Sequence, residues 1–221
     1  GLSVDRTLVS ASHTHAGLEG FALDRRNIAG NPHIGIFSEE MLNFVTGRIA
    51  QALTEANAAL QPVKAGAGRT KIEGMNRNRR DDEFVDKELT LLRLDRADGT
   101  PYVVLVNFTA HETIMSPDEM LISAGWPGMM QRTVEAALGE GVTCMYTNGA
   151  EGDISPAGRQ GGSNWERAEN FGQRVGLRAT ALARSIEGTE VDAFAVRSLW
   201  VQLPPRQAAP EFVMIAGSDY H

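Results

Sequence analysis

The chain alternates short apolar runs with longer segments in which apolar residues recur every three or four positions. A run of about six apolar residues suits a buried strand, whereas the longer spacing is typical of one face of a helix. Alternation of this kind, without internal repeats, predicts an α/β fold: a mixed β-sheet flanked by helices in a single layered domain. Strands are expected over residues 7–12, 89–94, 102–107, 142–147 and 194–203, and helices over residues 38–60, 126–139 and 164–186.

Capping and turn residues set the expected limits of several elements. Ser38 precedes two glutamates and can cap the first helix, which Pro62 would end. The pair Asp98-Gly99 between two apolar runs is typical of a hairpin. The Gly-rich stretch before Gly74 is interpreted as a turn, and residues 16–35 as a long loop of the kind that is often functional.

Length and charge exclude several classes of protein. The 221 residues are enough for one sizeable core and contain no evident linker, so residues 1–221 are expected to form one domain. With 21 Lys plus Arg against 28 Asp plus Glu, the net charge of −7 argues against nucleic acid as a partner. No apolar run approaches the roughly 20 residues that cross a bilayer. Because a predicted strand follows so soon after Gly1, we expect an upstream part of the protein to be absent.

The first segment with candidate chemistry is Ser12-His-Thr-His-Ala-Gly17. Two histidines two positions apart at a strand end can reach one cleft, and imidazole is a common zinc ligand. A surface loop that happens to hold two of the five histidines would look the same. The pair alone therefore leaves both interpretations open.

A second histidine-bearing loop, Asn107-Phe-Thr-Ala-His-Glu112, also follows a predicted strand. A single histidine is more often a satisfied polar residue of the core than a ligand. If the two strands are neighbours, however, His13 or His15 and His111 converge at one end of the sheet and offer two or three nitrogen donors to one metal. Glu112 and Glu151 are candidate oxygen ligands or general bases, although acidic residues in loops are usually only solvated.

The third loop, residues 146–156, contains two glycines whose backbone N–H groups could approach an oxyanion, and Ser155 adds a hydroxyl. A plain Gly-Asp turn, in which Ser155 caps its own backbone, is the competing interpretation.

Taken in order, four segments resemble the neutral/alkaline non-lysosomal ceramidase family over about residues 8–203. They are His13-Thr-His15-Ala-Gly17, Asn76-Arg77, Asn107-Phe-Thr-Ala-His111 and Thr147-Asn148-Gly149-Ala-Glu-Gly152-Asp153-Ile-Ser155-Pro156. The resemblance implies a zinc-dependent amidase that splits the N-acyl bond of ceramide, a small lipid substrate. It also implies a secreted or periplasmic location and is compatible with peripheral membrane contact; the oligomeric state stays open.

The resemblance also implies roles for individual residues. His13 and His111 would bind Zn²⁺, and His15 would lie beside the metal and handle the substrate or its oxyanion. Ser155 would lie at the reaction centre. The residues expected to contact substrate are Arg77, Asn148, Gly149 and Gly152. The family completes its zinc site with a Glu and a Tyr far downstream of the serine, and we expect these two ligands to lie outside this sequence.

Two other functions fit parts of the pattern. A barrel-type metal-dependent amidohydrolase also places an HxH pair after an early strand, but it needs further histidines and an aspartate on later strands. A non-catalytic or incomplete homologue that binds metal or lipid would carry the same loops without turnover.

Overall fold

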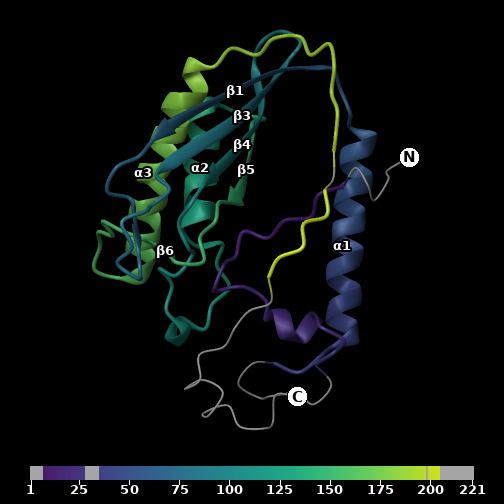
Figure 1. The fold of residues 1–221 in the computed structure, drawn as a ribbon. Helices are drawn as coiled ribbons and strands as arrows, with labels where there is room; N and C mark the ends of the chain where they lie inside the picture. Colours follow the sequence, from purple (N-terminus) through teal and green to yellow (C-terminus); the bar gives the residue numbers. More distant parts are fainter. Residues whose placement is uncertain (1–6, 28–34, 198, 205–221) are drawn as a thin grey trace.

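The computed structural model describes residues 7–27, 35–197 and 199–204. Its centre is a four-stranded sheet in the order β1-β3-β4-β5, with α2 and α3 packed on one face (Figure 1). The strands of this sheet are β1 (Val63–Lys71), β3 (Glu88–Arg96), β4 (Pro101–Phe108) and β5 (Thr143–Asn148), and the two helices are α2 (Gly125–Leu138) and α3 (Asn164–Ser185). The predicted α/β fold with a mixed sheet is confirmed.

The expected hairpin is formed by β3 and β4, which pair antiparallel from Leu89 opposite Phe108 to Asp95 opposite Pro101. The Asp98 carboxylate accepts the N–H of Thr100 at 2.9 Å, and Gly99 adopts a φ of +86° that few other residues tolerate. The turn chemistry was therefore sufficient to predict the pairing of two strands.

The chain then crosses through α2 to β5, which pairs with β4 in parallel from Val103 opposite Thr143 to Phe108 opposite Asn148. Because the strands are parallel, their carboxyl ends meet at the same edge of the sheet. The loops that follow Phe108 and Asn148 therefore start side by side. Two of the three predicted loops are brought together by this crossover alone.

An aromatic cluster fixes the helices to this part of the sheet. The ring of Trp126 on α2 packs edge-on against those of Phe108, Tyr146 and Phe171, with centroids 6.2, 5.1 and 5.1 Å apart. Trp126, Phe108 and Phe171 are fully buried. The carboxyl ends of β4 and β5 are therefore anchored in the best-packed region of the core.

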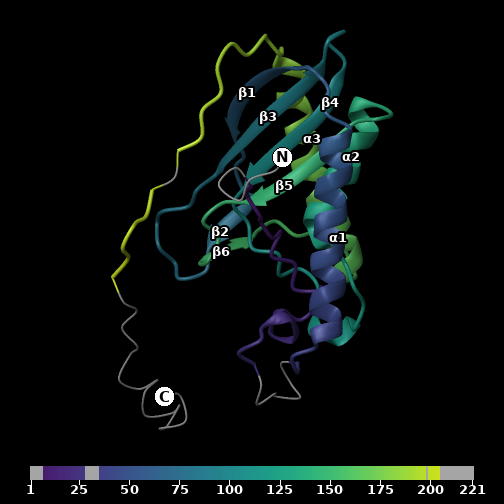
Figure 2. The ribbon, with the colours of Figure 1, turned by 90° about the vertical axis from the view of Figure 1, so that its right-hand side faces the viewer.

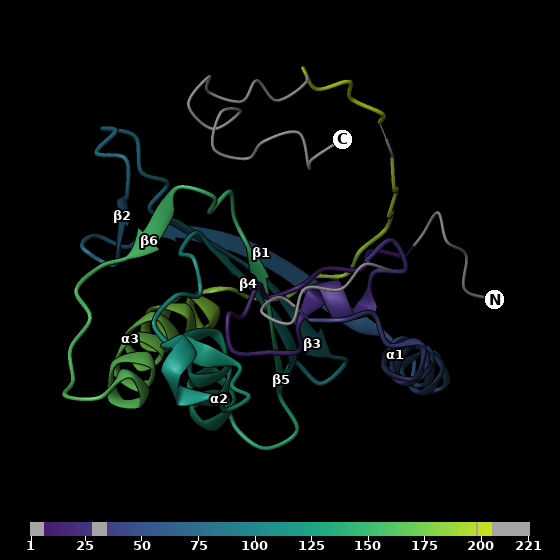
Figure 3. The same ribbon diagram turned by 90° about the horizontal axis from the view of Figure 1, so that it is seen from below.

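The first long helix, α1 (Glu39–Ala58), forms where the sequence predicts it, and the Ser38 hydroxyl accepts the N–H of Met41 at 3.2 Å. None of its residues is buried, and the helix stands apart from the sheet in Figure 1 and, seen from below, in Figure 3; in Figure 2 it overlaps α2 and α3 in projection. Phe44, for example, is 60% exposed. The apolar spacing predicted the helix but not its surroundings.

Two predicted strands are wrong. Among the described residues, neither 7–12 nor 194–203 forms a strand. The chain after α3 pairs with the sheet through an isolated bridge between Thr189 and Ala65, and then leaves the edge. Both segments have the composition of strands, but neither belongs to a sheet in the part of the chain that the structure describes.

The Gly-rich stretch predicted as a turn is instead the middle of β1, where Gly66 and Gly68 face α3. A Cβ at Gly66 would lie 2.5 Å from Cγ2 of Ile186, so the glycines allow the helix end to approach the strand closely. The long loop also contains a short 3-10 helix, η2 (Gly20–Leu23), while its residues 28–34 lie outside the described part.

The described strands form an open four-stranded sheet and a separate two-stranded ribbon of β2 (Asn76–Asn78) and β6 (Ile154–Pro156). Neither resembles the closed eight-stranded barrel that a barrel-type amidohydrolase requires. That alternative is therefore not supported by the fold. No described helix has both the length and the apolar content needed to span a membrane.

Candidate metal centre

Three imidazole rings from two distant parts of the chain converge at the edge of the sheet. Nε2 of His13 lies 2.9 Å from Nε2 of His111 and 3.1 Å from Nε2 of His15, and the distance between His15 and His111 is 3.0 Å. In the described part of the chain these are the side chains whose arrangement suits a metal ion. The predicted convergence is confirmed, although His13 and His15 reach the centre from a segment that contains no strand and turns at His15.

His111 is held from both sides by the loop between β5 and β6. Its backbone N–H donates to the carbonyl oxygen of Ile154 at 2.9 Å, and its Nδ1 lies 3.2 Å from the carbonyl oxygen of Glu151. Since a carbonyl oxygen can only accept, an Nδ1–H that donates to Glu151 leaves the Nε2 lone pair free for a metal. This hydrogen bond is a usual way of orienting a ligating histidine.

His13 and His15 are placed by the threonine between them. The Thr14 hydroxyl turns inward and donates to the carbonyl oxygen of Ser123 at 2.7 Å, and the N–H of Ser123 donates to the carbonyl oxygen of Ala16 at 2.8 Å. His13 has a φ of +59°, which is uncommon for a residue with a side chain. The two flanking imidazoles, both on exposed residues, reach the same centre as a result.

The donor set fits a divalent cation that accepts nitrogen ligands. Burial is the main cause that lowers the pKa of His15 and of His111, so both rings favour the neutral form that binds metals. Three nitrogens about 2.0–2.1 Å from a tetrahedral zinc would stand about 3.3 Å apart. The observed separations are slightly shorter, and they make His15 as close to the centre as the two histidines expected to be ligands.

Of the two candidate carboxylates, only that of Glu151 lies near the histidines. Its Oε1 is 3.9 Å from Nε2 of His13, and its side chain is 10% exposed. Burial raises the pKa of the Glu151 carboxyl to about 7; Arg79 opposes this rise and Glu112 adds to it. Glu112 is instead fully buried, and its Oε1 accepts the N–H of Trp126 at 2.9 Å.

Arg79 is a site residue that the sequence analysis missed. Its Nη2 donates to the carbonyl oxygen of Gly152 at 3.0 Å and also contacts Nδ1 of His111, while its backbone N–H donates to Asp153 at 2.7 Å. Arg77 lies in β2, and Arg79, two positions further on, directly follows the last residue of that strand. That spacing in the sequence was the available signal, because alternate residues of a strand share a face.

The ribbon of β2 and β6 pairs Arg77 directly with Ser155, so these two predicted residues share one of its faces. Arg77 is exposed and Ser155 is half-buried. Ser155 follows Ile154, whose carbonyl oxygen accepts the N–H of His111. Two residues singled out separately in the sequence are thus brought together beside the histidine loop.

The glycines of the third loop have structural tasks. The N–H of Gly149 donates to the carbonyl oxygen of Phe108 at 3.4 Å, and a Cβ there would lie 1.9 Å from Oγ1 of Thr109. Gly152 accepts the bond from Arg79. Asn148 ends β5, and its Oδ1 is buried without a hydrogen-bond partner. Stabilisation of an oxyanion by the Gly149 N–H would require its long bond to Phe108 to open.

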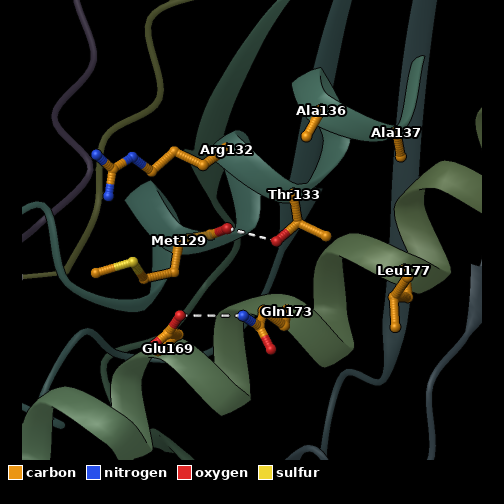
Figure 4. A pocket seen from close by; sticks show the side chains of 8 residues that line it. All are labelled: Met129, Arg132, Thr133, Ala136, Ala137, Glu169, Gln173 and Leu177. Atoms are coloured by element: carbon orange, nitrogen blue, oxygen red, sulfur yellow. Dashed lines mark hydrogen bonds between the residues drawn. The ribbon is translucent and has the colours of Figure 1, made fainter. Parts of the chain in front are cut away.

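Two hollows lie on different parts of the surface. One adjoins the histidines and is lined by His13, Thr14, His15, Gly17, Leu18, Glu19 and Gly20. The other lies between α2 and α3 (Figure 4), where Thr133 donates to the Met129 carbonyl and Gln173 donates to Glu169. None of the predicted site residues lines this second hollow, whereas His13 and His15 line the first.

The chain is similar to two curated proteins of Dictyostelium discoideum. It is 26% identical to neutral ceramidase B over 171 residues, which cover 67% of this chain and 23% of that protein. It is also 26% identical to neutral ceramidase A over 174 residues, 69% of this chain and 24% of that protein. No family model matches. The chain therefore spans about a quarter of the length of these curated relatives.

Solved structures give the same picture for the fold. A neutral ceramidase from Pseudomonas aeruginosa superposes with a TM-score of 0.66 at 24% identity, and a ceramidase complexed with C2 superposes with a TM-score of 0.67 at 23% identity. Each covers 80% of this chain and 30% of the solved chain. The resemblance that the ordered motifs carry is confirmed.

Proposed function

We propose that this relative of the neutral ceramidases is a metal-dependent hydrolase that cleaves the N-acyl amide bond of ceramide or a related N-acyl lipid. The observation that carries the proposal is the triangle of His13, His15 and His111, whose Nε2 atoms lie within 3.1 Å of one another. The two curated relatives, both called neutral ceramidases, support the reaction class.

Zinc is the metal that we propose, held by His13 and His111 with His15 at or beside the ion. Bound there, it would supply Lewis acidity toward an acyl carbonyl and lower the pKa of a water molecule. The neutral imidazoles of the site provide the lone pairs that such an ion needs.

The remaining steps are proposed for the residues of the chain itself. His15 would hold the developing oxyanion or move its proton, with the Glu151 carbonyl fixing the neighbouring His111 ring and Arg79 holding the Gly152 carbonyl beside it. Ser155 would orient the scissile carbonyl or the attacking water, and Arg77 would hold a polar group of the substrate from the opposite strand. Asn148, Gly149 and Gly152 would shape the loop under the substrate.

Direct attack by Ser155 is the alternative mechanism, and it predicts a different intermediate. An acyl-enzyme should then accumulate with a slow ester or amide substrate and add the acyl mass to the peptide that contains Ser155. The Ser155→Ala variant should lose that adduct. Orientation by Ser155 predicts reduced turnover in this variant and no adduct in the unmodified protein.

We further propose a secreted or periplasmic location and peripheral contact with lipid surfaces. The support is the lipid nature of the proposed substrate and the hollow beside the histidines, where Leu18 is 50% exposed.

The test combines metal analysis with hydrolysis of a fluorogenic N-acyl sphingoid lipid. The protein should bind about one equivalent of Zn²⁺, and His13→Ala and His111→Ala should lose both zinc and chelator-sensitive hydrolysis. Gln51→Ala on α1 is the control that should change neither. Normal hydrolysis by zinc-free protein and by both histidine variants would contradict the proposal.

A non-catalytic homologue is the second candidate. Its specific support is that three nitrogen donors converge while no described carboxylate joins them, together with the partial span of the relatives. It predicts zinc binding or lipid binding without turnover, and chelator-sensitive hydrolysis by the chain would exclude it.

A further inference from the structure

We propose that Glu112 is a positioning residue of the histidine site. Its buried carboxylate hydrogen-bonds the loop that carries His111 to the start of α2. The segment that carries His13 and His15 is hydrogen-bonded to Ser123, just before the same helix. The inference rests on the proposed metal site. Beyond that site, the inference identifies the part of the chain that fixes the distance between His111 and the pair His13 and His15.

The first step is the unusual cap of α2. Ala124 precedes the helix and makes no side-chain hydrogen bond to it. The Ser123 hydroxyl accepts the N–H of Gly125 at 3.0 Å, and Glu112 supplies the acceptor for the next N–H from another part of the chain, since its Oε1 accepts the N–H of Trp126 at 2.9 Å. A carboxylate at the start of a helix is also favoured by the helix dipole. Glu112 thus connects the residue next to His111 directly to α2.

The second step is the space that Gly125 leaves for this contact. Gly125 has a φ of +57°, and a Cβ on it would lie 1.9 Å from Oε1 of Glu112. No side chain is compatible with the carboxylate in its present place. The absence of a side chain at Gly125 is therefore what leaves room for the Glu112 carboxylate.

The third step is that the same turn holds the other half of the site. We call residues 123–126 the junction. Ser123 accepts the hydroxyl of Thr14 on its carbonyl oxygen at 2.7 Å and donates its N–H to Ala16 at 2.8 Å. These bonds flank His13 and His15, while Glu112 ties His111 to Trp126. The two segments that carry the histidines are thus both hydrogen-bonded to the junction.

Packing alone does not account for a carboxylate at position 112. Glu112 is fully buried, and its second oxygen has no hydrogen-bond partner among the described residues. An apolar residue would fill this place at lower desolvation cost if packing were its only task. What the carboxylate adds is one directed bond to the junction.

The experiment compares Glu112→Ala, Glu112→Gln and Gly125→Ala with the unmodified protein. Glutamine keeps an oxygen acceptor of the same length, whereas alanine removes it and Gly125→Ala pushes the carboxylate off the Trp126 N–H. Glu140→Ala, which removes an exposed carboxylate just after α2, is the control. Zinc affinity is measured by competition with a chromophoric chelator, and folding of the metal-free protein by circular dichroism.

We expect Glu112→Ala and Gly125→Ala to weaken zinc binding about 10–100-fold, the usual cost of losing an outer partner of a metal ligand, while Glu112→Gln stays within a few-fold. Wild-type zinc affinity in folded Glu112→Ala would overturn the inference. If Glu112→Ala does not fold, the contrast between Glu112→Gln and Gly125→Ala decides, and equal affinities in these two variants would also overturn it.

A metal-free measurement separates this inference from the proposed function. Nuclear Overhauser contacts between the rings of His13 and His111 are expected in the unmodified apo-protein and should weaken in Gly125→Ala but not in Glu112→Gln. Absence of zinc binding by the unmodified protein would defeat the proposed function, and the ring contacts would still decide the role of Glu112. Unchanged ring contacts in Gly125→Ala would overturn that role.

Discussion

The two halves of the histidine site are built in opposite ways. His111 follows β4 and lies next to the buried cluster of Phe108 and Trp126, whereas His13 and His15 belong to residues 7–17, which we call the arm and which contain no helix or strand. Leu8 in the arm is 88% exposed, while Phe108 is fully buried. Seen from below, the arm crosses in front of the end of the sheet and does not join it as a strand (Figure 3). The packed core therefore fixes the position of His111, whereas a few hydrogen bonds fix the positions of His13 and His15.

The sharpest test of this contrast is thiol accessibility. Cys144 on β5 is buried, and burial together with Glu135 raises the pKa of its thiol to about 12, so it stays protonated at pH 8. A cysteine introduced at exposed Leu8 should react with a thiol reagent immediately. In Leu8→Cys we expect one fast and one slow equivalent, with rates differing by at least ~10³-fold because Cys144 must wait for the core to open. Two fast equivalents would show that the core is no better protected than the arm.

Deleting a core side chain should have the next largest effect. Phe108→Ala should lower the free energy of unfolding by about 3–5 kcal/mol, since it leaves a cavity beside Trp126. Leu8→Ala in the arm should change it by less than about 0.5 kcal/mol. Urea unfolding of the two variants measures both values. Comparable losses would mean that the arm unfolds together with the core.

A smaller loss is expected where the third loop touches the core. Gly149→Ala places a Cβ 1.9 Å from Oγ1 of Thr109, so the loop or the threonine must move. Overpacking of this kind costs about 1–3 kcal/mol. Gly152→Ala is the matched control, because nothing lies within 4 Å of a Cβ at that glycine. Equal stability of the two variants would show that the loop adapts without cost.

The smallest expected change isolates the attachment of the arm. Thr14→Val removes the hydroxyl that donates to Ser123 and keeps the shape of the side chain. A hydrogen bond of this kind contributes about 0.5–1.5 kcal/mol, so zinc affinity should fall roughly 2–10-fold. The unfolding free energy of the metal-free protein should stay the same. A loss of stability without a loss of affinity would reverse the roles of arm and core.

Local patterns predicted those parts of the fold that depend on neighbouring residues. The hairpin followed from its Asp-Gly turn, and α1 from its cap and spacing. The convergence of His13, His15 and His111 was also predicted, but through a strand over residues 7–12 that does not form. A strand needs a partner, and a single sequence does not say which edge is free.

The contacts that escaped prediction join distant elements; Glu112 was expected as a candidate oxygen ligand or general base and not as a partner of α2. Arg79, the residue after β2, reaches His111 and Gly152, and Glu112 contacts the start of a helix that begins thirteen positions after it. Gly66 and Gly68 looked like turn residues because the helix end that requires them lies more than a hundred positions away. The sequence shows the charge and type of each of these residues, but it does not show which distant residue each one contacts.

The separation of His13 and His111 along the chain gives the site a second consequence. The two rings touch although 98 positions lie between them. An ion shared by both would close a loop of that length, much as a disulfide does, and a cross-link of about 100 residues removes chain entropy worth about 4–5 kcal/mol from the unfolded state. The metal centre would then stabilise the fold as well as take part in the reaction. Without the ion, the arm would be held to the junction by the hydrogen bonds of Thr14 and Ala16 to Ser123, while the sheet would keep its packed core.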